Sequence, residues 1–109
     1  MKEYFGFEKI NESGLEGELV EMTPREFIQK TMPGAAFSEI ESYIDKEKAR
    51  NYSEKMNLGE KFPVPCLINY SNCACHEGKH RAYAAMILGI QKIPVQVIDK
   101  KSMQFFTWE

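Results

Sequence analysis

A helix between two strand-like segments in the second half of the chain limits the possible folds more than any other feature. Residues 79–88 (KHRAYAAMIL) have helical character and are apolar nearly all round, so we expect this helix to be buried. Its alanines would allow a close approach to a sheet. Residues 64–70 before it and 93–98 after it are rich in the residue types that favour strands. The pattern predicts a sheet with helices packed against it.

A short strand and a helix are expected in the first half. Residues 19–22 favour a strand, and the helix signal follows at once. Thr23 would be the N-cap, and Pro24 would be the first helical residue, where its missing N–H costs nothing. Glu26 would complete a capping box. The helix is expected to be short because Pro33-Gly34 stops it.

Two further helical segments follow. Ser38 and Glu41 offer a second capping box. Asp45 either caps a new helix or lies within a continuing one; the sequence leaves both open. Residues 46–56 form a charged helix with a narrow apolar stripe, and Gly59 suits the left-handed position after its end.

A second short strand is expected at residues 72–76, after a tight connection. The predicted class is therefore α/β (α+β), with a small mixed sheet and flanking helices. The 109 residues suit one domain, 1–109. Its core would span about 19–98, with an N-terminal arm at 1–18 and an apolar C-terminal tail at 101–109.

Charge and cysteine content exclude several classes of protein. The net charge is −2, which argues against coating nucleic acid through bulk charge, and no apolar run reaches the roughly 20 residues of a membrane span. Cys66, Cys73 and Cys75 cannot all pair within one chain, so we expect a protein of the reducing cytoplasm. Residues 61–109 carry 6 basic and 3 acidic side chains, against 8 and 13 in residues 1–60. If the protein has a site for an anion, the second half is therefore the place to search for it.

The segment 77–81 (EGKHR) is the most informative for chemistry. A strand ends, Gly78 turns the chain, and a helix begins with Lys79, His80 and Arg81. Amide groups at a helix N-terminus favour an anion, and an arginine can hold two phosphate oxygens at once. Cations there oppose the helix dipole, so stability alone does not account for three of them. The alternative is a solvated basic corner whose side chains bond to carbonyls or to Glu77.

The sequence from 77 to 97 resembles the signature of the ParB/sulfiredoxin superfamily. The matching residues are EGKHRAYAA at 77–85, Leu88-Gly89 and IPVQV at 93–97, preceded by a proline-led strand at 62–68 (FPVPCLI). The resemblance covers about 19–98. It implies that Gly78, Lys79, His80 and Arg81 bind the phosphates of a nucleoside triphosphate, ATP or CTP, with Mg²⁺. Glu77 would lie beside them as a metal-side carboxylate or base.

On this resemblance an enzymatic role would be that of a nucleotide-dependent phosphotransferase or NTPase, with Glu77 and His80 as catalytic residues. Three departures from the family pattern limit which of the family's activities can be expected. Lys79 stands where sulfiredoxin has its catalytic cysteine, so sulfinic acid repair is not expected. ParB partition proteins usually have arginine at the position of His80. They also continue into a helix-turn-helix region, which these 109 residues do not show.

The sequence is also compatible with two other functions. One is a DNA-directed protein of the nuclease or mobile-element type, since the basic half leaves room for a local DNA patch. A salt-dependent gel shift would identify it. The other is a non-catalytic interaction or regulatory module that has kept the fold and lost the chemistry.

Two residue groups suggest other sites. Cys66, Cys73, Cys75, His76 and His80 are potential zinc ligands, although Cys73 and Cys75 would point to one face of a strand and His76 to the other. Aromatic residues gather near both ends of the chain: Tyr4, Phe5 and Phe7, and Phe105, Phe106 and Trp108. They either cover the core and sheet edges or form a partner surface, such as a homodimer contact through the tail.

Overall fold

The main sheet has four strands in the computed structural model, which describes residues 3–9, 17–70 and 74–100. Their order is β2 (Glu18–Met22), β6 (Ile93–Lys100), β4 (Cys66–Tyr70) and β5 (Ala74–Glu77). Strand β6 is antiparallel to β2 and parallel to β4, and β5 is antiparallel to β4. The parallel pair requires a crossover, which β5 and α4 (Lys79–Ile87) provide.

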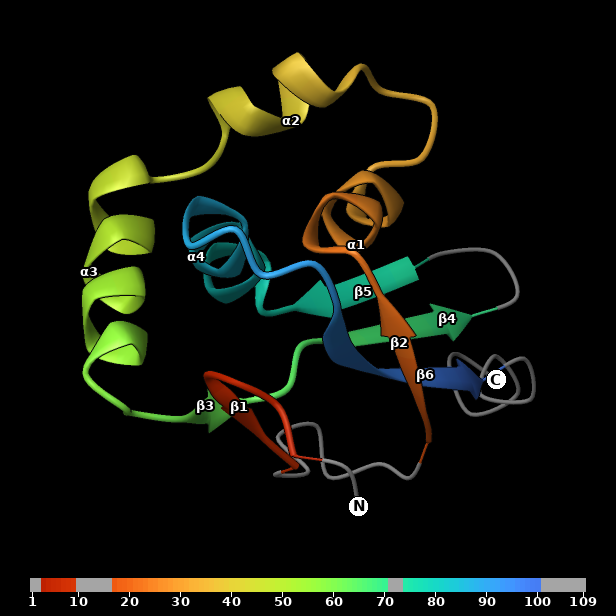
Figure 1. The fold of residues 1–109 in the computed structure, drawn as a ribbon. Helices are drawn as coiled ribbons and strands as arrows, with labels where there is room; N and C mark the ends of the chain where they lie inside the picture. The colour runs from red at the N-terminus through yellow and green to blue at the C-terminus, as the bar shows by residue number, and fades with distance from the viewer. Residues whose placement is uncertain (1–2, 10–16, 71–73, 101–109) are drawn as a thin grey trace.

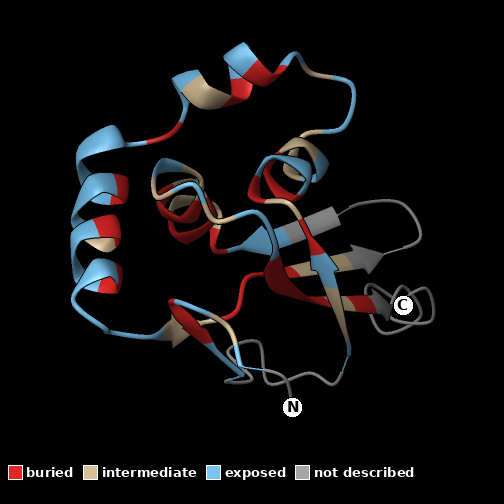
Figure 2. Ribbon diagram, in the orientation of Figure 1, coloured by how far each residue is buried: buried red, intermediate tan, exposed pale blue. Residues whose placement is uncertain are grey.

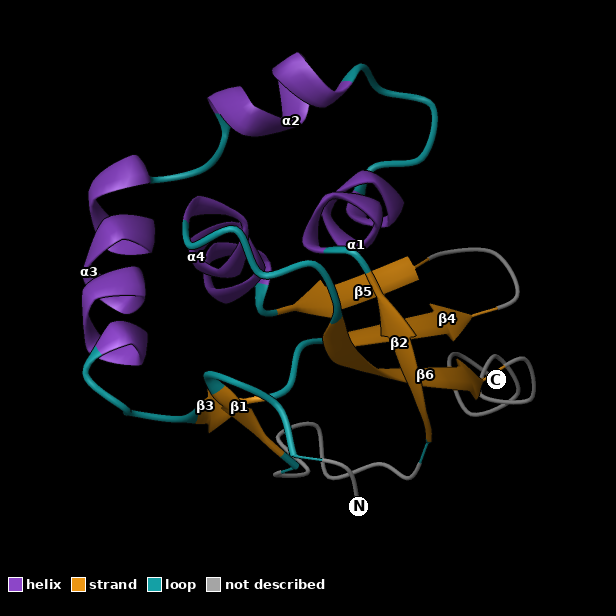
Figure 3. Ribbon diagram, viewed as in Figure 1, coloured by secondary structure: helices purple, strands orange, loops and turns teal. Residues whose placement is uncertain are grey.

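Strand β6 forms the centre of the sheet and is buried on both faces. Ile93 and Val95 lie in the main core, while Gln96 and Ile98 are buried on the opposite face. Burial on both sides explains why this segment is apolar without a regular polar alternation. The main core lies between one face of the sheet and the helices, which group together on one side of it (Figure 3).

A second, two-stranded sheet joins the N-terminal arm to the body. Strand β1 (Phe7–Glu8) runs parallel to β3 (Phe62–Pro63). Phe7 is fully buried in the core, whereas Phe5 is about half exposed (52%). The hydroxyl of Tyr4 donates a hydrogen bond to Glu21 Oε2 at 2.5 Å. The described part of the arm thus covers the core, one of the two readings left open by its aromatic residues.

The predicted cap of the first helix is confirmed. Helix α1 (Pro24–Thr31) has Pro24 in its first turn, and Thr23 Oγ1 accepts a hydrogen bond from the Glu26 amide at 3.0 Å. Phe27 and Ile28 are both fully buried. The cap and this buried pair fix where α1 begins and which side faces the core.

The second capping box is wrong. Helix α2 (Phe37–Ser42) begins before Ser38, with Ala36 as its N-cap and no side-chain cap. Phe37 is largely buried, and the guanidinium carbon of Arg25 lies 4.0 Å from the centre of its ring. Burying a phenylalanine contributes about 1.5–3 kcal/mol, more than the roughly 1 kcal/mol of a typical cap. Tertiary packing therefore sets the start of α2.

Helices α3 and α1 flank α4 (Figure 1). Asp45 does cap a new helix, α3 (Lys46–Asn57), because its carboxylate accepts the Lys48 amide at 3.1 Å. The buried residues of α3 lie on the side toward α4 (Figure 2). The alanines of α4 allow close approach to α3 and α1 rather than to the sheet. Helix α4 is also not buried all round as expected, because Ile87 is 48% exposed.

The α+β class and the mixed sheet with flanking helices are confirmed. The strand expected at 72–76 is shifted, since β5 begins at Ala74 among the described residues. Gly59 has the predicted positive φ, +99°. The tail at 101–109, and with it the expected homodimer contact, lies outside the described residues.

Candidate functional site

Gly78 joins β5 to α4 and is the first of the expected phosphate-binding residues. Its φ is +105°, a conformation that strains any residue with a side chain, and the residue is buried. A Cβ here would lie 2.8 Å from Cα of Pro65 and 2.8 Å from Nη2 of Arg81. The position therefore requires glycine, because the start of α4 lies directly against the chain that enters β4.

The N-terminus of α4 is suited to an anion. Its N-cap is Gly78, which supplies no side-chain hydrogen bond, and its first turn contains no acidic residue. The amide groups of a first helical turn carry partial positive charge. Lys79 and Arg81 add two full charges to this end, in the place where a stable helix normally has acidic residues.

Arg81 is held against the backbone at this junction. The residue is only 7% exposed, and its Nη2 atom lies over Gly78. The side chain thus turns back toward the N-terminus of its own helix, which fixes the guanidinium within the site. Arg81 therefore contributes a positive charge beside the start of α4.

His80 connects the start of α4 to the start of α3. Its Nε2 accepts a hydrogen bond from the backbone amide of Asp45 at 3.1 Å. Burial, together with the charges of Lys48 and Lys79, lowers the pKa of His80 below its usual 6.5, although Asp45 and Glu77 act in the opposite direction. The ring is therefore neutral at pH 7, with Nε2 as the acceptor and the proton on Nδ1.

The structure brings all five residues of the 77–81 segment to one small polar hollow of about 40 Å³. The lining residues are Lys48, Tyr52, Glu77, Gly78, Lys79, His80 and Arg81. Liquid water occupies about 30 Å³ per molecule, so the hollow matches a small ion or a single phosphate group rather than a whole nucleotide. A base and sugar would have to lie outside it, on the surface.

Helix α3 contributes two lining residues that the sequence analysis did not single out. Lys48 and Tyr52 are one helical turn apart, so they share a face of α3. The Tyr52 ring packs edge-on against Phe62, with 5.0 Å between ring centres. The i, i+4 spacing was visible in the sequence, but only the fold shows that this face meets the start of α4.

The charges around the hollow are mainly positive. Lys48, Lys79 and Arg81 are cationic, whereas Glu77 is the one acidic side chain among the lining residues. This balance contrasts with the net charge of −2 for the whole chain. The local charge therefore favours an anionic ligand that the average charge would disfavour.

The structure gives no support to the zinc hypothesis. Among the described residues, no group of three His, Cys, Asp or Glu side chains is placed to hold a metal ion. His80 Nε2 is already occupied by the Asp45 amide, and Cys66 is buried in β4. Cys73 lies outside the described residues.

Comparisons with known proteins add no information about this site. No family model matches the chain, and no curated protein or solved structure shows significant similarity to it. Within the described ranges, no helix has the length and hydrophobicity needed to cross a membrane.

Proposed function

We propose that the protein binds the phosphate of a nucleotide at the junction of α3 and α4. The observation that carries this proposal is the gathering of Lys48, Lys79 and Arg81 around a polar hollow at the uncapped start of α4. The ParB/sulfiredoxin-like signature at 77–97 points to two of these residues, Lys79 and Arg81. Charge-assisted hydrogen bonds to phosphate contribute roughly 1.5–3 kcal/mol each, so these cations suffice for a specific site.

In this proposal each residue has a separate role. Gly78 lets the start of α4 lie directly against the chain that enters β4, which sets the position of the helix amides. Arg81 and Lys79 contact phosphate oxygens. His80 is a positioning residue, because its Nε2 holds the start of α3. Its Nδ1–H is the ring group left to donate toward the ligand. Lys48 contacts the ligand from the α3 side of the hollow.

The same arrangement suits phosphoryl transfer or nucleotide hydrolysis. An acceptor hydroxyl or water would attack the terminal phosphorus, the bond to the bridging oxygen would break, and the diphosphate would leave. The cations would stabilise the charge on the transferred group. Glu77 would accept the proton of the attacking group or hold Mg²⁺. A single carboxylate fits Mg²⁺, which commonly combines one or two carboxylates with substrate phosphates and water.

Calorimetry with ATP, CTP, GTP and ADP, each with and without Mg²⁺, tests the proposal. Lys48→Ala is the informative variant because Lys48 is exposed and its loss should not unfold the chain. Lys55→Ala, an exposed lysine near the other end of α3, is the matched control. We expect Lys48→Ala to weaken binding about tenfold or more, the equivalent of one charged contact, and Lys55→Ala to leave it unchanged.

Two results would contradict the proposal. One is the absence of binding heat for every nucleotide with folded protein. The other is equal affinity for the Lys48→Ala and Lys55→Ala variants, with Arg81→Ala also binding normally. A gel shift on duplex DNA that weakens steeply with salt would favour the DNA-directed alternative instead.

A further inference from the structure

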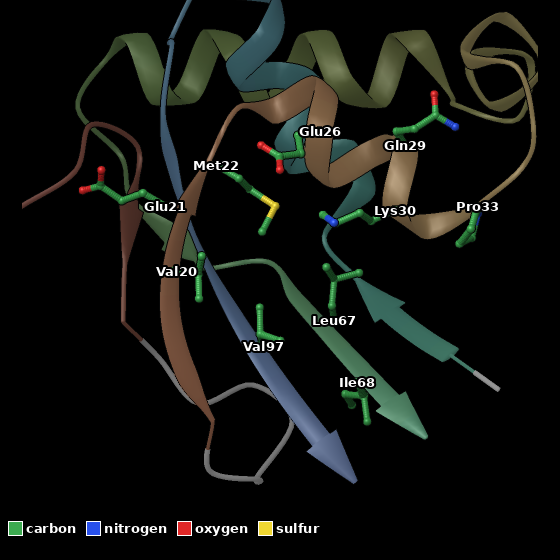
Figure 4. Close-up of a pocket in the computed structure, with 10 residues that line it drawn as sticks. All are labelled: Val20, Glu21, Met22, Glu26, Gln29, Lys30, Pro33, Leu67, Ile68 and Val97. Carbon is green, nitrogen blue, oxygen red and sulfur yellow. The ribbon is translucent and has the colours of Figure 1, made fainter. Parts of the chain in front are cut away.

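Two grooves border helix α1 and share no lining residue. The first has a volume of about 660 Å³ and lies between α1 and the sheet, with a floor of Val20, Leu67 and Val97 (Figure 4). Glu26 and Lys30 both line it, so it carries charges of both signs, and charge does not select a ligand for it. The second has a volume of about 380 Å³ and lies between the start of α1 and the end of α4. We call this second groove the α1–α4 groove.

The α1–α4 groove combines apolar surface with positive charge. Its lining residues are Thr23, Pro24, Arg25, Met86, Gly89, Ile90, Gln91 and Lys92. Met86 and Ile90 are half-buried, whereas Arg25 and Lys92 are exposed. None of these lining residues is acidic, and Glu26, which follows Arg25, lines the other groove. The groove therefore presents two positive charges in a chain whose net charge is −2.

Hydrogen bonds at two helix ends fix both sides of the α1–α4 groove. On one side, the side chain of Thr23 caps α1. On the other, the amide of Ile90 donates a hydrogen bond to the Ala85 carbonyl at 3.0 Å. The amide of Gly89 donates to the Met86 carbonyl, also at 3.0 Å, which completes a Schellman motif with Gly89 at a φ of +76°. The groove is therefore formed before a ligand binds, which lowers the entropy cost of binding.

The guanidinium of Arg25 is held in place and can still bind a carboxylate. Its central carbon lies over the Phe37 ring, 4.0 Å from the ring centre, and that ring is largely buried. A guanidinium that stacks on a ring uses its flat face, so its N–H donors remain available at the edge. No ion pair within the part of the chain that the structure describes includes Arg25 or Lys92. Both charges are therefore available to a partner.

We propose that the α1–α4 groove docks an acidic peptide segment of a partner protein. One carboxylate of the segment binds Arg25 and a second binds Lys92. An apolar side chain between them packs against Met86 and Ile90. Small ligands usually have roughly 70–90% of their surface buried in a pocket, which a groove with exposed residues along its rim does not provide. A peptide suits such a groove because it combines several separate contacts.

The α1–α4 groove is separate from the proposed phosphate site. It lies at the end of α4, whereas the polar hollow lies at the start of this nine-residue helix, about 13 Å away along its axis. The two sites share no lining residue. Both can therefore be occupied at once, and substitutions in one should not affect binding at the other.

A phage-displayed library of random dodecapeptides, selected on the full chain, tests the proposal without assuming a partner sequence. We expect the selected peptides to be rich in aspartate and glutamate around a large apolar residue. Fluorescence anisotropy of a labelled, selected peptide then gives its Kd. Arg25→Gln should raise the Kd about tenfold or more, the equivalent of one charged contact, and Lys92→Gln should also raise it. Arg50→Gln and Lys55→Gln, at exposed positions of α3, are the matched controls and should leave it unchanged.

Several results would overturn the proposal. One is a selection that yields no peptides or peptides without acidic residues. Another is an equal Kd for the Arg25→Gln and Arg50→Gln variants, with Lys92→Gln also binding normally. Lys92 lies in an exposed loop, so its substitution remains informative if Arg25→Gln disturbs the contact with Phe37 and the far-UV circular dichroism changes.

Two other occupants are distinguished by the same variants. Duplex DNA that displaces the peptide, and whose own binding is lost in Lys92→Gln, would assign the groove to nucleic acid and overturn the proposal. A dimer seen by light scattering and lost in Arg25→Gln would assign the groove to a second copy and also overturn it. Lys48→Ala, the variant that should weaken nucleotide binding, should leave the peptide Kd unchanged. Failure of one proposal is therefore distinguishable from failure of the other.

Discussion

Gly78→Ala should destabilise the protein through two separable effects. Alanine in a left-handed conformation costs about 1–2 kcal/mol. The φ of +105° at Gly78 is in this disfavoured range. The new Cβ would also lie 2.8 Å from the backbone Cα of Pro65, a contact that requires the chain to shift. Overpacking of this kind costs about 1–3 kcal/mol. Together the two effects predict a loss of about 2–5 kcal/mol.

Gly59→Ala is the control that isolates the second effect. Gly59 has nearly the same conformation, with φ of +99°, but a Cβ there would meet no atom within 4 Å. It should therefore lose only the conformational part, about 1–2 kcal/mol. The difference between the two variants measures how closely the start of α4 approaches the chain that enters β4.

Urea unfolding followed by circular dichroism gives both values, and thermal unfolding gives a second reading. A loss of 2 kcal/mol corresponds to a fall of about 10 °C or more in Tm for a domain of this size. Equal losses for Gly78→Ala and Gly59→Ala would refute the reasoning. That result would mean that the backbone near Pro65 moves aside freely and that the tight junction is not needed.

Three further predictions concern the hydrogen bond between Tyr83 and Glu41, the cap of α1 and the contact of His80 with the start of α3. Tyr83→Phe removes the hydrogen bond from Tyr83 Oη to Glu41 Oε2 (2.7 Å) and should cost about 1 kcal/mol in urea unfolding; no loss would mean that water replaces the bond equally well. Thr23→Ala removes the cap of α1 and should also cost about 1 kcal/mol, whereas Thr23→Ser should restore most of it. Burial lowers the pKa of His80, so protonation disfavours the native state, and stability should fall as the pH drops below about 6.5. The stability advantage of the wild type over His80→Gln should shrink over the same pH range, and a constant difference between pH 8 and pH 5 would exclude this role.

The sequence was sufficient to predict those features that depend only on neighbouring residues. Thr23 and the glycine after α3 were predicted correctly because capping and positive φ depend on near neighbours. The second capping box failed because the burial of Phe37, which packs against Arg25 of α1, outweighs a local cap. Which side chains are buried between two helices depends on the whole fold, so neighbouring residues do not reveal it.

The candidate site likewise contains some residues that the sequence predicts and others that only the fold identifies. The five residues at 77–81 are contiguous, so their common location followed from the strand–glycine–helix pattern. Lys48 had the appearance of one exposed lysine among several, and nothing near it in the sequence distinguishes it from Lys55. The groove lined by Val20, Leu67 and Val97 could not be predicted from the sequence either, since it arises from three strands brought together by the sheet.

The central position of β6 has a consequence for biosynthesis. The partners of β6, β2 and β4, are both made earlier, and β2 is the most distant from it in sequence. During translation the helices can form as soon as they emerge, but the sheet cannot close before residues 93–100 are available. Pairing between distant segments is slow because the connecting loop loses entropy first. The nascent chain would therefore keep the apolar residues of β2 exposed until β6 has been made, an interval in which a chaperone could bind them.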